Sequence, residues 1–463
     1  MKKTVVIDVV GLTTGLIGEN TPFLKEWSLK ASQATVQPVM PAVTCTAHAT
    51  YYTGKWPDEH GIVANGWYYR DVCEVRNWHQ SNKLVEAPKI WEVAKELDPT
   101  FTCANMGWWF NMYSSVDYSV TPRPQYLEDG RKFPDCYTQP ADLRDYLQAK
   151  FGTFPLFTYW GPNTNIKSTQ WLADASIEVD QKYNPTLTLI YLPHLDYNLQ
   201  RIGPEDPRIA TDLQEIDKVC KQLVEYYESK GAQVILLSEY GITQVDRPIM
   251  LNRVLRKEGL LAIREERGLE LLDAGASDAF AVADHQIAHI YVKNEADIPR
   301  IKKLIEAVPG VDKVYAGKER EQLHLAHSRA GEIIAIADAR SWFGYYYWFD
   351  DAKAPDFARL VAIHKKPGFD PVELHADPKI KFLLPKVAFK VLKKKLGFRM
   401  LMDIIPLDPT LVKGSHGRMP DSRKEYPLIM TKNKDLLGQS HIQPTEVFDV
   451  ILAHLKSHKE VAV

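Results

Sequence analysis

Short apolar runs recur along the chain, and most of them are rich in β-branched residues. Each run is bounded by Gly, Pro, Asp or Asn, a pattern typical of strands that are buried on both faces of a sheet. We predict strands over five of these runs: Thr4–Ile7, Thr186–Leu192, Gln233–Leu237, Ile287–Val292 and Glu332–Ala337.

Helical patterns lie between the strand-like runs. Pro88–Leu97 begins with a proline, which is favoured in the first turn of a helix. Pro207–Gly231 carries apolar side chains at roughly helical spacing, including Ile216, Val219 and Leu223, and it ends at a glycine. Strands that alternate with helices predict an α/β fold with a doubly wound, mostly parallel sheet.

The alternation is interrupted between residues 246 and 400. Ala296–Leu304 and Val308–Val314 predict a smaller α/β unit there, so we expect an inserted cap region at 246–400 and a core made of 1–245 and 401–463. Pro385–Lys395 is basic and amphipathic. A solvated surface helix is the simpler interpretation of so short a stretch, and contact with a membrane or an anionic partner is the alternative.

Composition narrows the class of protein. The 463 residues are 45% hydrophobic and 25% charged, as in a globular chain, and the net charge of −2 gives no electrostatic reason to expect a nucleic-acid polymer as partner. Five scattered cysteines without a C-x-x-C pair support neither a disulfide framework nor a zinc ribbon. No run reaches about 18 apolar residues, and Asp8 interrupts the N-terminal run without a cleavage site after it. We therefore expect a cytoplasmic protein without a transmembrane segment.

Polar residues at a few positions carry the candidate chemistry. Asp8, Asp196 and Glu239 follow apolar runs, and ligands of doubly wound sheets bind outside the carboxyl ends of strands, so we expect one shared crevice. Thr44 is a candidate nucleophile, which metal coordination could activate. Asn65 could donate a hydrogen bond to developing negative charge. These parts predict a metal-assisted phosphoryl-transfer site.

The segment PAVTCTAHATYYTGKWPDEHGIVANGWYY, which contains Thr44 and Asn65, resembles the nucleophile segment of one branch of the alkaline phosphatase superfamily. That branch is the type I phosphodiesterase / nucleotide pyrophosphatase family, and the spacing of 21 positions from Thr44 to Asn65 fits it. Similarity continues through SEYG, HSRAGEI and GSHG. The resemblance implies an alkaline phosphatase-like fold and a phosphodiesterase or nucleotide pyrophosphatase. It also implies a small phosphate ester substrate, a phospho-threonine intermediate on Thr44 and two divalent metal ions.

The resemblance also implies the metal ligands, with departures from the family pattern. Carried over to this chain, the ligands of one ion are Asp196, Gln200 and His416, and those of the other are Asp8, Thr44, Glu239 and Tyr240. Gln200 and Tyr240 stand where the family has histidines, and Glu239 stands where it has an aspartate. Carboxylate, amide and phenol oxygens favour Mn²⁺ or Mg²⁺ relative to the Zn²⁺ of the histidine-rich version.

Several residues near these segments offer alternatives. Cys45 is a rival nucleophile, but a sulfatase would need a C/S-x-P-x-R context that Cys45 lacks. Asp284 and His285 form another acid–histidine pair. We expect them in a strand of the cap region, but they are also the candidates to replace the metal-binding histidines that are missing at positions 200 and 240. Arg418 could contact a phosphate bidentately. His48 is expected to be structural, together with His60, His289 and His327.

Two other functions stay open at this point. A phosphomonoesterase or phosphonate hydrolase acting on a small metabolite would use the same scaffold. A non-catalytic protein that binds a phosphate ligand is the other, because the substitutions at positions 200, 239 and 240 could have degraded a metal site. The intact Thr44 and Asn65 favour an enzyme.

Overall fold

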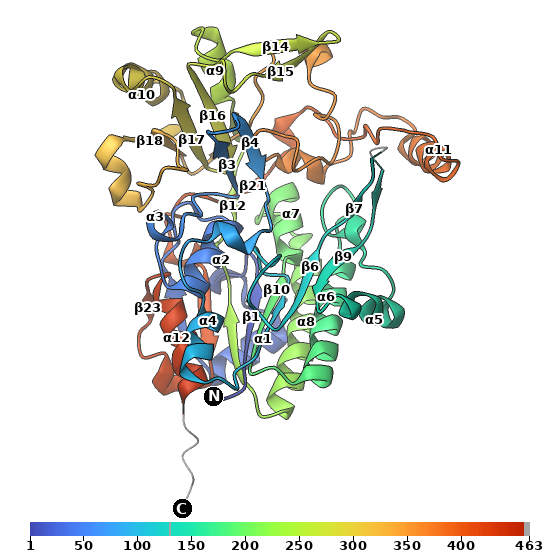
Figure 1. Cartoon of the computed structure of the whole chain (residues 1–463), viewed down its shortest axis with the longest axis vertical. Helices are drawn as coiled ribbons and strands as arrows, with labels where there is room; N and C mark the ends of the chain where they lie inside the picture. The colour runs from blue at the N-terminus through green and yellow to red at the C-terminus, as the bar shows by residue number, and fades with distance from the viewer. Residues whose placement is uncertain (129–130, 458–463) are drawn as a thin grey trace, which may run out of the picture.

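The computed structural model describes residues 1–128 and 131–457, and its largest element is a nine-stranded sheet (Figure 1). In spatial order the strands are β23 (His441–Ile442), β2 (Ser32–Val36), β22 (Leu428–Thr431), β11 (Gln233–Leu237), β1 (Thr4–Val9), β10 (Leu187–Leu192), β5 (Cys103–Met106), β6 (Tyr118–Pro122) and β9 (Cys136–Gln139). β1 lies in the middle and runs parallel to β10 and β11, and β5 and β6 continue the parallel order. β22 and β9 are antiparallel to their neighbours.

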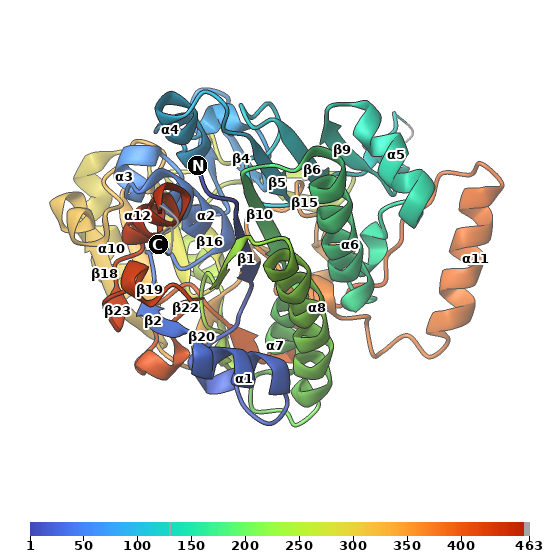
Figure 2. The ribbon, with the colours of Figure 1, turned by 90° about the horizontal axis from the view of Figure 1, so that it is seen from below.

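Helices cover both faces of this sheet (Figure 2). On one face lie α1 (Pro22–Lys30), α6 (Ile166–Tyr183) and α8 (Ile209–Ser229), and on the other lie α2 (Thr44–Thr53), α4 (Ile90–Leu97) and α12 (Glu446–Lys456). Every residue of β1, β10 and β11 is buried, which explains their continuous apolar runs. The predicted doubly wound, mostly parallel sheet is confirmed.

Three further helices belong to the core. They are α3 (Pro57–His60), α5 (Asp142–Phe151) and α7 (His194–Ile202). The predicted strand Thr4–Ile7 extends to Val9 and so includes Asp8. The two predicted helices are shorter than their patterns, because the leading prolines and the closing Gly231 lie outside the hydrogen-bonded turns.

A second, antiparallel sheet lies above the carboxyl ends of the central strands (Figure 1). Its order is β16 (Ala279–Asp284), β17 (Ile287–Val292), β19 (Ile333–Ala337) and β18 (Val311–Ala316), and α9 (Leu251–Lys257) and α10 (Ile298–Glu306) pack on it. The predicted small unit corresponds to α10 and β18. The apolar runs at β17 and β19 belong to this sheet rather than to the large one, a distinction that the burial pattern of a single strand cannot make.

Small two-stranded ribbons accompany the two sheets. They are β3 (Gly66–Tyr69) with β4 (Glu74–Asn77), β7 (Gln125–Tyr126) with β8 (Lys132–Phe133), β12 (Thr243–Gln244) with β21 (Gly414–Ser415), β13 (Arg247–Ile249) with β20 (Ser341–Phe343), and β14 (Ile263–Glu266) with β15 (Leu269–Leu272). The β12–β21 pair brings the GSHG segment beside the chain that follows SEYG. Helix α11 (Leu383–Lys395) projects to one side (Figure 1). Among the described residues, no helix is both long and apolar enough to cross a membrane.

Candidate active site

Three acidic residues meet at the carboxyl ends of the central strands. Asp8 lies within β1, in register with Tyr191 and Leu237 of the neighbouring strands. Glu239 follows β11 by two residues, and Asp196 lies in the first turn of α7, directly after β10. All three side chains are buried. The structure therefore brings them to one place, as the order of strands predicts.

Thr44 is the first residue of α2, and a tyrosine joins its hydroxyl to one of these acids. Thr44 Oγ1 lies 3.1 Å from the phenol oxygen of Tyr240, and that phenol donates to Asp196 Oδ1 at 3.2 Å. Because the single phenol proton is given to Asp196, the Thr44 hydroxyl is the donor to Tyr240. The result is a continuous chain of hydrogen bonds from Thr44 to a buried carboxylate.

Burial sets the protonation of this chain. Desolvation raises the pKa of Tyr240, and the charges of Asp196 and Glu239 raise it further, so the phenol keeps its proton. Desolvation also raises the pKa of Asp196 to about 7, against hydrogen bonds from Gln200 and Tyr240. A carboxylate with such a pKa can accept and return a proton near neutral pH.

Asn65 is held on both sides. Its Oδ1 accepts from the backbone N–H of Cys45 at 3.0 Å, and its Nδ2 donates to Asp284 Oδ1 at 3.1 Å. The Asn65 backbone N–H donates to Asp284 Oδ2 at 2.8 Å. An amide nitrogen has two N–H bonds, so one of them is left for a ligand. The thiol of Cys45 is buried, and burial raises its pKa, which disfavours the rival nucleophile.

Asp284 and His285 therefore lie beside the candidate site as well as at the end of a strand of the second sheet. Asp284 ends β16, and His285 occupies the turn into β17 with a φ of 61°, a conformation uncommon outside glycine. His285 Nδ1 lies 2.7 Å from Asp284 Oδ1, and the ring stacks on Phe369 and contacts the ring of His416. Burial lowers the pKa of His285, so its ring is neutral and its Nε2 is free of a proton.

His48, one turn after Thr44 on α2, contacts two of the candidate ligands, a position that the sequence-based expectation of a structural role did not include. Its Nε2 lies 2.9 Å from Asp8 Oδ2 and 2.7 Å from Glu239 Oε1. The i, i+4 spacing from Thr44 to His48 on a helix, which places both on one face, was the available signal.

The backbone decides which nitrogen of His48 carries the proton. The N–H of Trp109 donates to Nδ1 at 3.1 Å, so the proton lies on Nε2 and points to the carboxylates. Burial lowers the pKa of His48, whereas Glu239 and Asp8 raise it, to about 9 on balance. A second ring proton would have to sit on Nδ1 against the Trp109 N–H. We therefore assign His48 as a neutral donor that orients Asp8 and Glu239.

Asp8 and Glu239 form a donor set that fits a divalent cation. Burial and the charge of Glu239 raise the pKa of Asp8. At Glu239 burial also disfavours the charged form, but the hydrogen bond from His48 is among the contacts that lower its pKa. Asp8 Oδ1 and Glu239 Oε2 are buried and accept no hydrogen bond from any described residue. Two buried carboxylates with free oxygen atoms lack compensating positive charge, and Thr44 lies beside them.

The second expected set, Asp196, Gln200 and His416, fits less well. The ring of His416 stacks on Tyr240, and its Nδ1 donates to the carbonyl of Ala42 at 2.7 Å, which leaves Nε2 free as in a metal-bound histidine. That Nε2 lies 3.9 Å from Asp196 Oδ1. Asp196 already accepts from Tyr240 and, at 2.9 Å, from Gln200 Nε2. Both carboxylate oxygens of Asp196, which a second ion would use as ligands, thus already accept hydrogen bonds from neutral donors.

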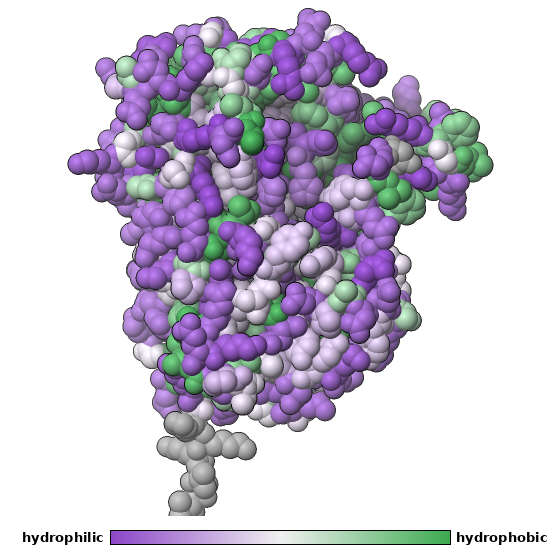
Figure 3. Space-filling model, viewed as in Figure 1, coloured by the Kyte–Doolittle hydropathy of each residue, from purple (hydrophilic) through white to green (hydrophobic). Residues whose placement is uncertain are grey.

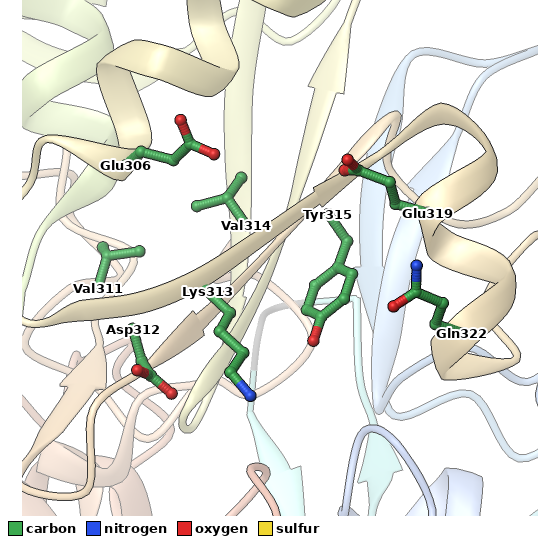
Figure 4. Close-up of a pocket in the computed structure, with 8 residues that line it drawn as sticks. All are labelled: Glu306, Val311, Asp312, Lys313, Val314, Tyr315, Glu319 and Gln322. Atoms are coloured by element: carbon green, nitrogen blue, oxygen red, sulfur yellow. The ribbon is translucent and has the colours of Figure 1, made fainter.

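Two other features lie outside this cluster. Arg418 pairs with Asp421, the nearest acid on its own turn, at 2.9 Å. A pocket on the outer edge of the second sheet is open to solvent between β18 and the turn at Glu319 and Gln322 (Figure 4). It contains none of the candidate site residues, and its lining mixes acidic, basic and apolar side chains.

Comparison with known proteins identifies the family of this chain. A sequence model of the type I phosphodiesterase / nucleotide pyrophosphatase family matches residues 4–370. An uncharacterized pyrophosphatase/phosphodiesterase of Schizosaccharomyces pombe is 25% identical over 224 residues, which are 47% of this chain and 40% of that protein. An ectonucleotide pyrophosphatase/phosphodiesterase of Caenorhabditis elegans is 21% identical over 374 residues, 77% of this chain and 43% of that one. The chain thus spans about two fifths of these relatives.

Solved structures show the same fold. Murine ectonucleotide pyrophosphatase / phosphodiesterase 5, as an inactive variant in complex with AMP, superimposes with a TM-score of 0.58 at 16% identity, covering 98% of this chain and 95% of the other. Phosphonoacetate hydrolase from Sinorhizobium meliloti 1021, in complex with phosphonoformate, gives a TM-score of 0.60 at 12% identity and covers 98% and 96%. With a family match that spans most of its length, this chain belongs to the type I phosphodiesterase / nucleotide pyrophosphatase family of the alkaline phosphatase superfamily.

Proposed function

We propose that this chain hydrolyses a small-molecule phosphodiester or pyrophosphate, with Thr44 as the nucleophile. The observation that carries the proposal is the buried chain of hydrogen bonds from Thr44 through Tyr240 to Asp196, beside the carboxylates of Asp8 and Glu239. A hydroxyl is a weak nucleophile unless its proton is removed. This arrangement offers a path for that proton.

In the first half-reaction, Thr44 Oγ1 forms a bond to phosphorus as the bond from phosphorus to the leaving oxygen breaks. The Thr44 proton passes to Tyr240 while the phenol proton passes to Asp196. The leaving oxygen takes a proton from solvent. The free N–H of Asn65 and the amide groups at the N-terminus of α2 would donate to the non-bridging oxygens.

In the second half-reaction, water attacks the phospho-threonine, and the bond from Thr44 Oγ1 to phosphorus breaks. The proton held by Asp196 returns through Tyr240 to Thr44, and the water loses one proton to solvent. The enzyme is thereby restored, so the same side chains serve in both directions. Asp284 and His285 keep the Asn65 amide in place during both steps.

Asp8, Glu239 and Thr44 would hold one divalent cation; Asp196, Gln200 and His416 fit a second one less well, because Asp196 already accepts from Tyr240 and Gln200. A bound cation would supply charge stabilisation for the nucleophile and the phosphoryl oxygens. The oxygen-rich first set suits Mn²⁺ or Mg²⁺. His48 positions the two carboxylates through its Nε2–H.

Trapping the intermediate tests the proposal. The chain is quenched in acid during turnover of bis-p-nitrophenyl phosphate, digested and analysed by mass spectrometry for a phosphoryl adduct on the Thr44 peptide. Thr44→Ala should lose both the adduct and activity, whereas Cys45→Ala should keep both. An adduct on Cys45, or full activity in Thr44→Ala, would refute the nucleophile assignment.

Parallel assays separate the candidate reactions. Preference for the diester over p-nitrophenyl phosphate and over a simple phosphonate supports the proposal. Preference for the monoester or for cleavage of a C–P bond would replace it with the phosphomonoesterase or phosphonate hydrolase alternative. Metal-dependent binding of a phosphate ligand without turnover would favour a binding protein.

A further inference from the structure

The segment between Asp377 and Asp403 leaves the body of the molecule and returns to it, with α11 at its far end (Figures 1 and 2). None of the residues of α11 is buried. A surface helix normally buries an apolar stripe and turns its charged residues to water. In α11, most of the large apolar side chains are instead exposed.

Three lysines of α11 are turned inward. Lys386, Lys390 and Lys394 are spaced four residues apart and so share one face. Lys386 Nζ donates to the carbonyl of Asp403 at 2.9 Å, and Lys390 also pairs with Asp403. Lys394 Nζ donates to the carbonyl of Lys132 at 2.8 Å. Polar contacts of these three lysines therefore help to attach the helix to the body, together with the half-buried Leu383 and Val387.

The outward face is apolar. Leu384, Phe389, Leu392 and Leu396 expose 80%, 58%, 52% and 65% of their surface. Further exposed side chains on the same segment are Phe382, Val391, Phe398 and Leu401. Figure 3 shows the resulting hydrophobic area on the projecting arm at the right of the molecule. Contiguous exposed apolar surface of this kind marks an interaction site, which favours the alternative of a membrane or anionic partner over an ordinary solvated helix.

The positive charge of this segment indicates which kind of partner its apolar face would bind. Residues 379–402 contain eight lysines and arginines and no acidic residue, so with a chain total of −2 the remaining residues carry −10. Among these basic residues, Lys381, Lys393, Lys395 and Arg399 are exposed around the apolar face. Apolar residues flanked by lysines match a helix that lies in the plane of an anionic membrane. A second copy of the chain would bring two such basic segments together, which electrostatic repulsion opposes.

We propose that the α11 segment, residues 379–402, docks this protein on an anionic lipid bilayer. The helix lies in the interface, with Leu384, Phe389, Leu392 and Leu396 among the acyl chains and the flanking lysines at the headgroup phosphates. At 13 residues α11 is too short to span the bilayer. Nothing in this inference depends on the chemistry proposed for Thr44.

Vesicle co-sedimentation of the full chain tests the proposal. Vesicles of phosphatidylcholine mixed with phosphatidylglycerol should bind the protein, vesicles of phosphatidylcholine alone should bind it much less, and added salt should weaken binding. Replacing Phe389, Leu392 and Leu396 together by serine should reduce binding by more than about tenfold. Melting temperature and activity should not change, since these side chains contact solvent in the free protein.

The matched control replaces three exposed apolar residues elsewhere, Leu29, Val72 and Leu97, by serine, and it should bind as the unchanged chain does. A second variant, Lys393→Glu with Lys395→Glu, should lose binding to the anionic vesicles without loss of fold. Binding to neither vesicle, or equal binding to both, would overturn the proposal. A dimer in light scattering that is lost in the serine variant would also overturn the proposal, because the apolar face would then be covered by a second copy of the chain.

Discussion

The phenol of Tyr240 lies 3.1 Å from Thr44 Oγ1 and donates to Asp196 at 3.2 Å. The resemblance to the family implies a histidine at this position, so the tyrosine would replace a nitrogen ligand by a group that carries a proton. The stack of Tyr240 on His416, with ring centroids 3.7 Å apart, holds the phenol between the two. Tyr240 is therefore placed to connect the proposed nucleophile with a buried acid.

Removing the hydroxyl of Tyr240 tests this connection. Tyr240→Phe should lower kcat for the diester by about 10²-fold, as expected when a proton-transfer group is lost, while KM and melting temperature change little. The control is Tyr52→Phe, since the Tyr52 hydroxyl is buried without a hydrogen-bond partner among the described residues. Equal activity of Tyr240→Phe and the unchanged enzyme would contradict the proton path.

Metal stoichiometry distinguishes the two donor sets. We expect one tightly bound divalent ion per chain after reconstitution with Mn²⁺ and desalting, measured by native mass spectrometry. Asp8→Asn and Glu239→Gln should abolish it, because the ion loses a buried carboxylate ligand. Asp196→Asn should retain it. Two tight ions, or retention in Glu239→Gln, would show that the assignment of the stronger site is wrong.

The support of Asn65 by Asp284 predicts a specific kinetic effect. Asp284→Asn replaces one carboxylate oxygen by an amide NH₂ and so disrupts its acceptance from the Asn65 amide. We expect kcat to fall by about tenfold or more with KM nearly unchanged, as when one donor to a developing charge is misplaced. Asp273→Asn, a change outside the site in the same part of the chain, serves as control. A rise in KM alone would assign Asp284 to substrate binding instead.

Buried acids make the stability of the metal-free protein depend on pH. Burial raises the pKa of Asp196 to about 7 and that of Asp284 to about 6. The folded state therefore binds these protons more tightly than the unfolded chain, and the free energy of unfolding falls as pH rises from about 4 to about 7. Each unit of pKa difference corresponds to about 1.4 kcal/mol. Thermal melts in chelator should show this slope, and Asp196→Asn should flatten it; a slope of opposite sign would contradict the assignment.

Close packing requires a glycine at position 241, next to Tyr240. A Cβ on Gly241 would lie 1.9 Å from the carbonyl oxygen of Glu425, a contact that the backbone must move to relieve. Gly241→Ala should therefore destabilise the protein by about 1–3 kcal/mol and displace Tyr240, lowering both melting temperature and activity. Gly18→Ala, where nothing lies within 4 Å of the added carbon, is the matched control. Similar melting temperatures for the two variants would argue against this packing.

Much of the fold was predictable from local patterns. The apolar runs at β1, β10 and β11 are continuous because both faces of these strands are covered, and their order with α8 implied a doubly wound sheet. The spacing of Thr44 and Asn65 within one segment likewise indicated the family, which the match over residues 4–370 confirms, and a candidate nucleophile. These features depend on residues close together in the chain, whose periodicity is visible without coordinates.

Contacts across the chain decided the rest. Three contacts of the candidate site join residues that are far apart in sequence. His48 contacts Glu239, Asp284 accepts hydrogen bonds from Asn65, and Tyr240 lies between Thr44 and Asp196. The periodicity of Pro385–Lys395 predicted an amphipathic helix but not which face would meet water. Periodicity reports which residues share a face, whereas the direction of that face is set by the packing of distant segments, which only the tertiary structure contains.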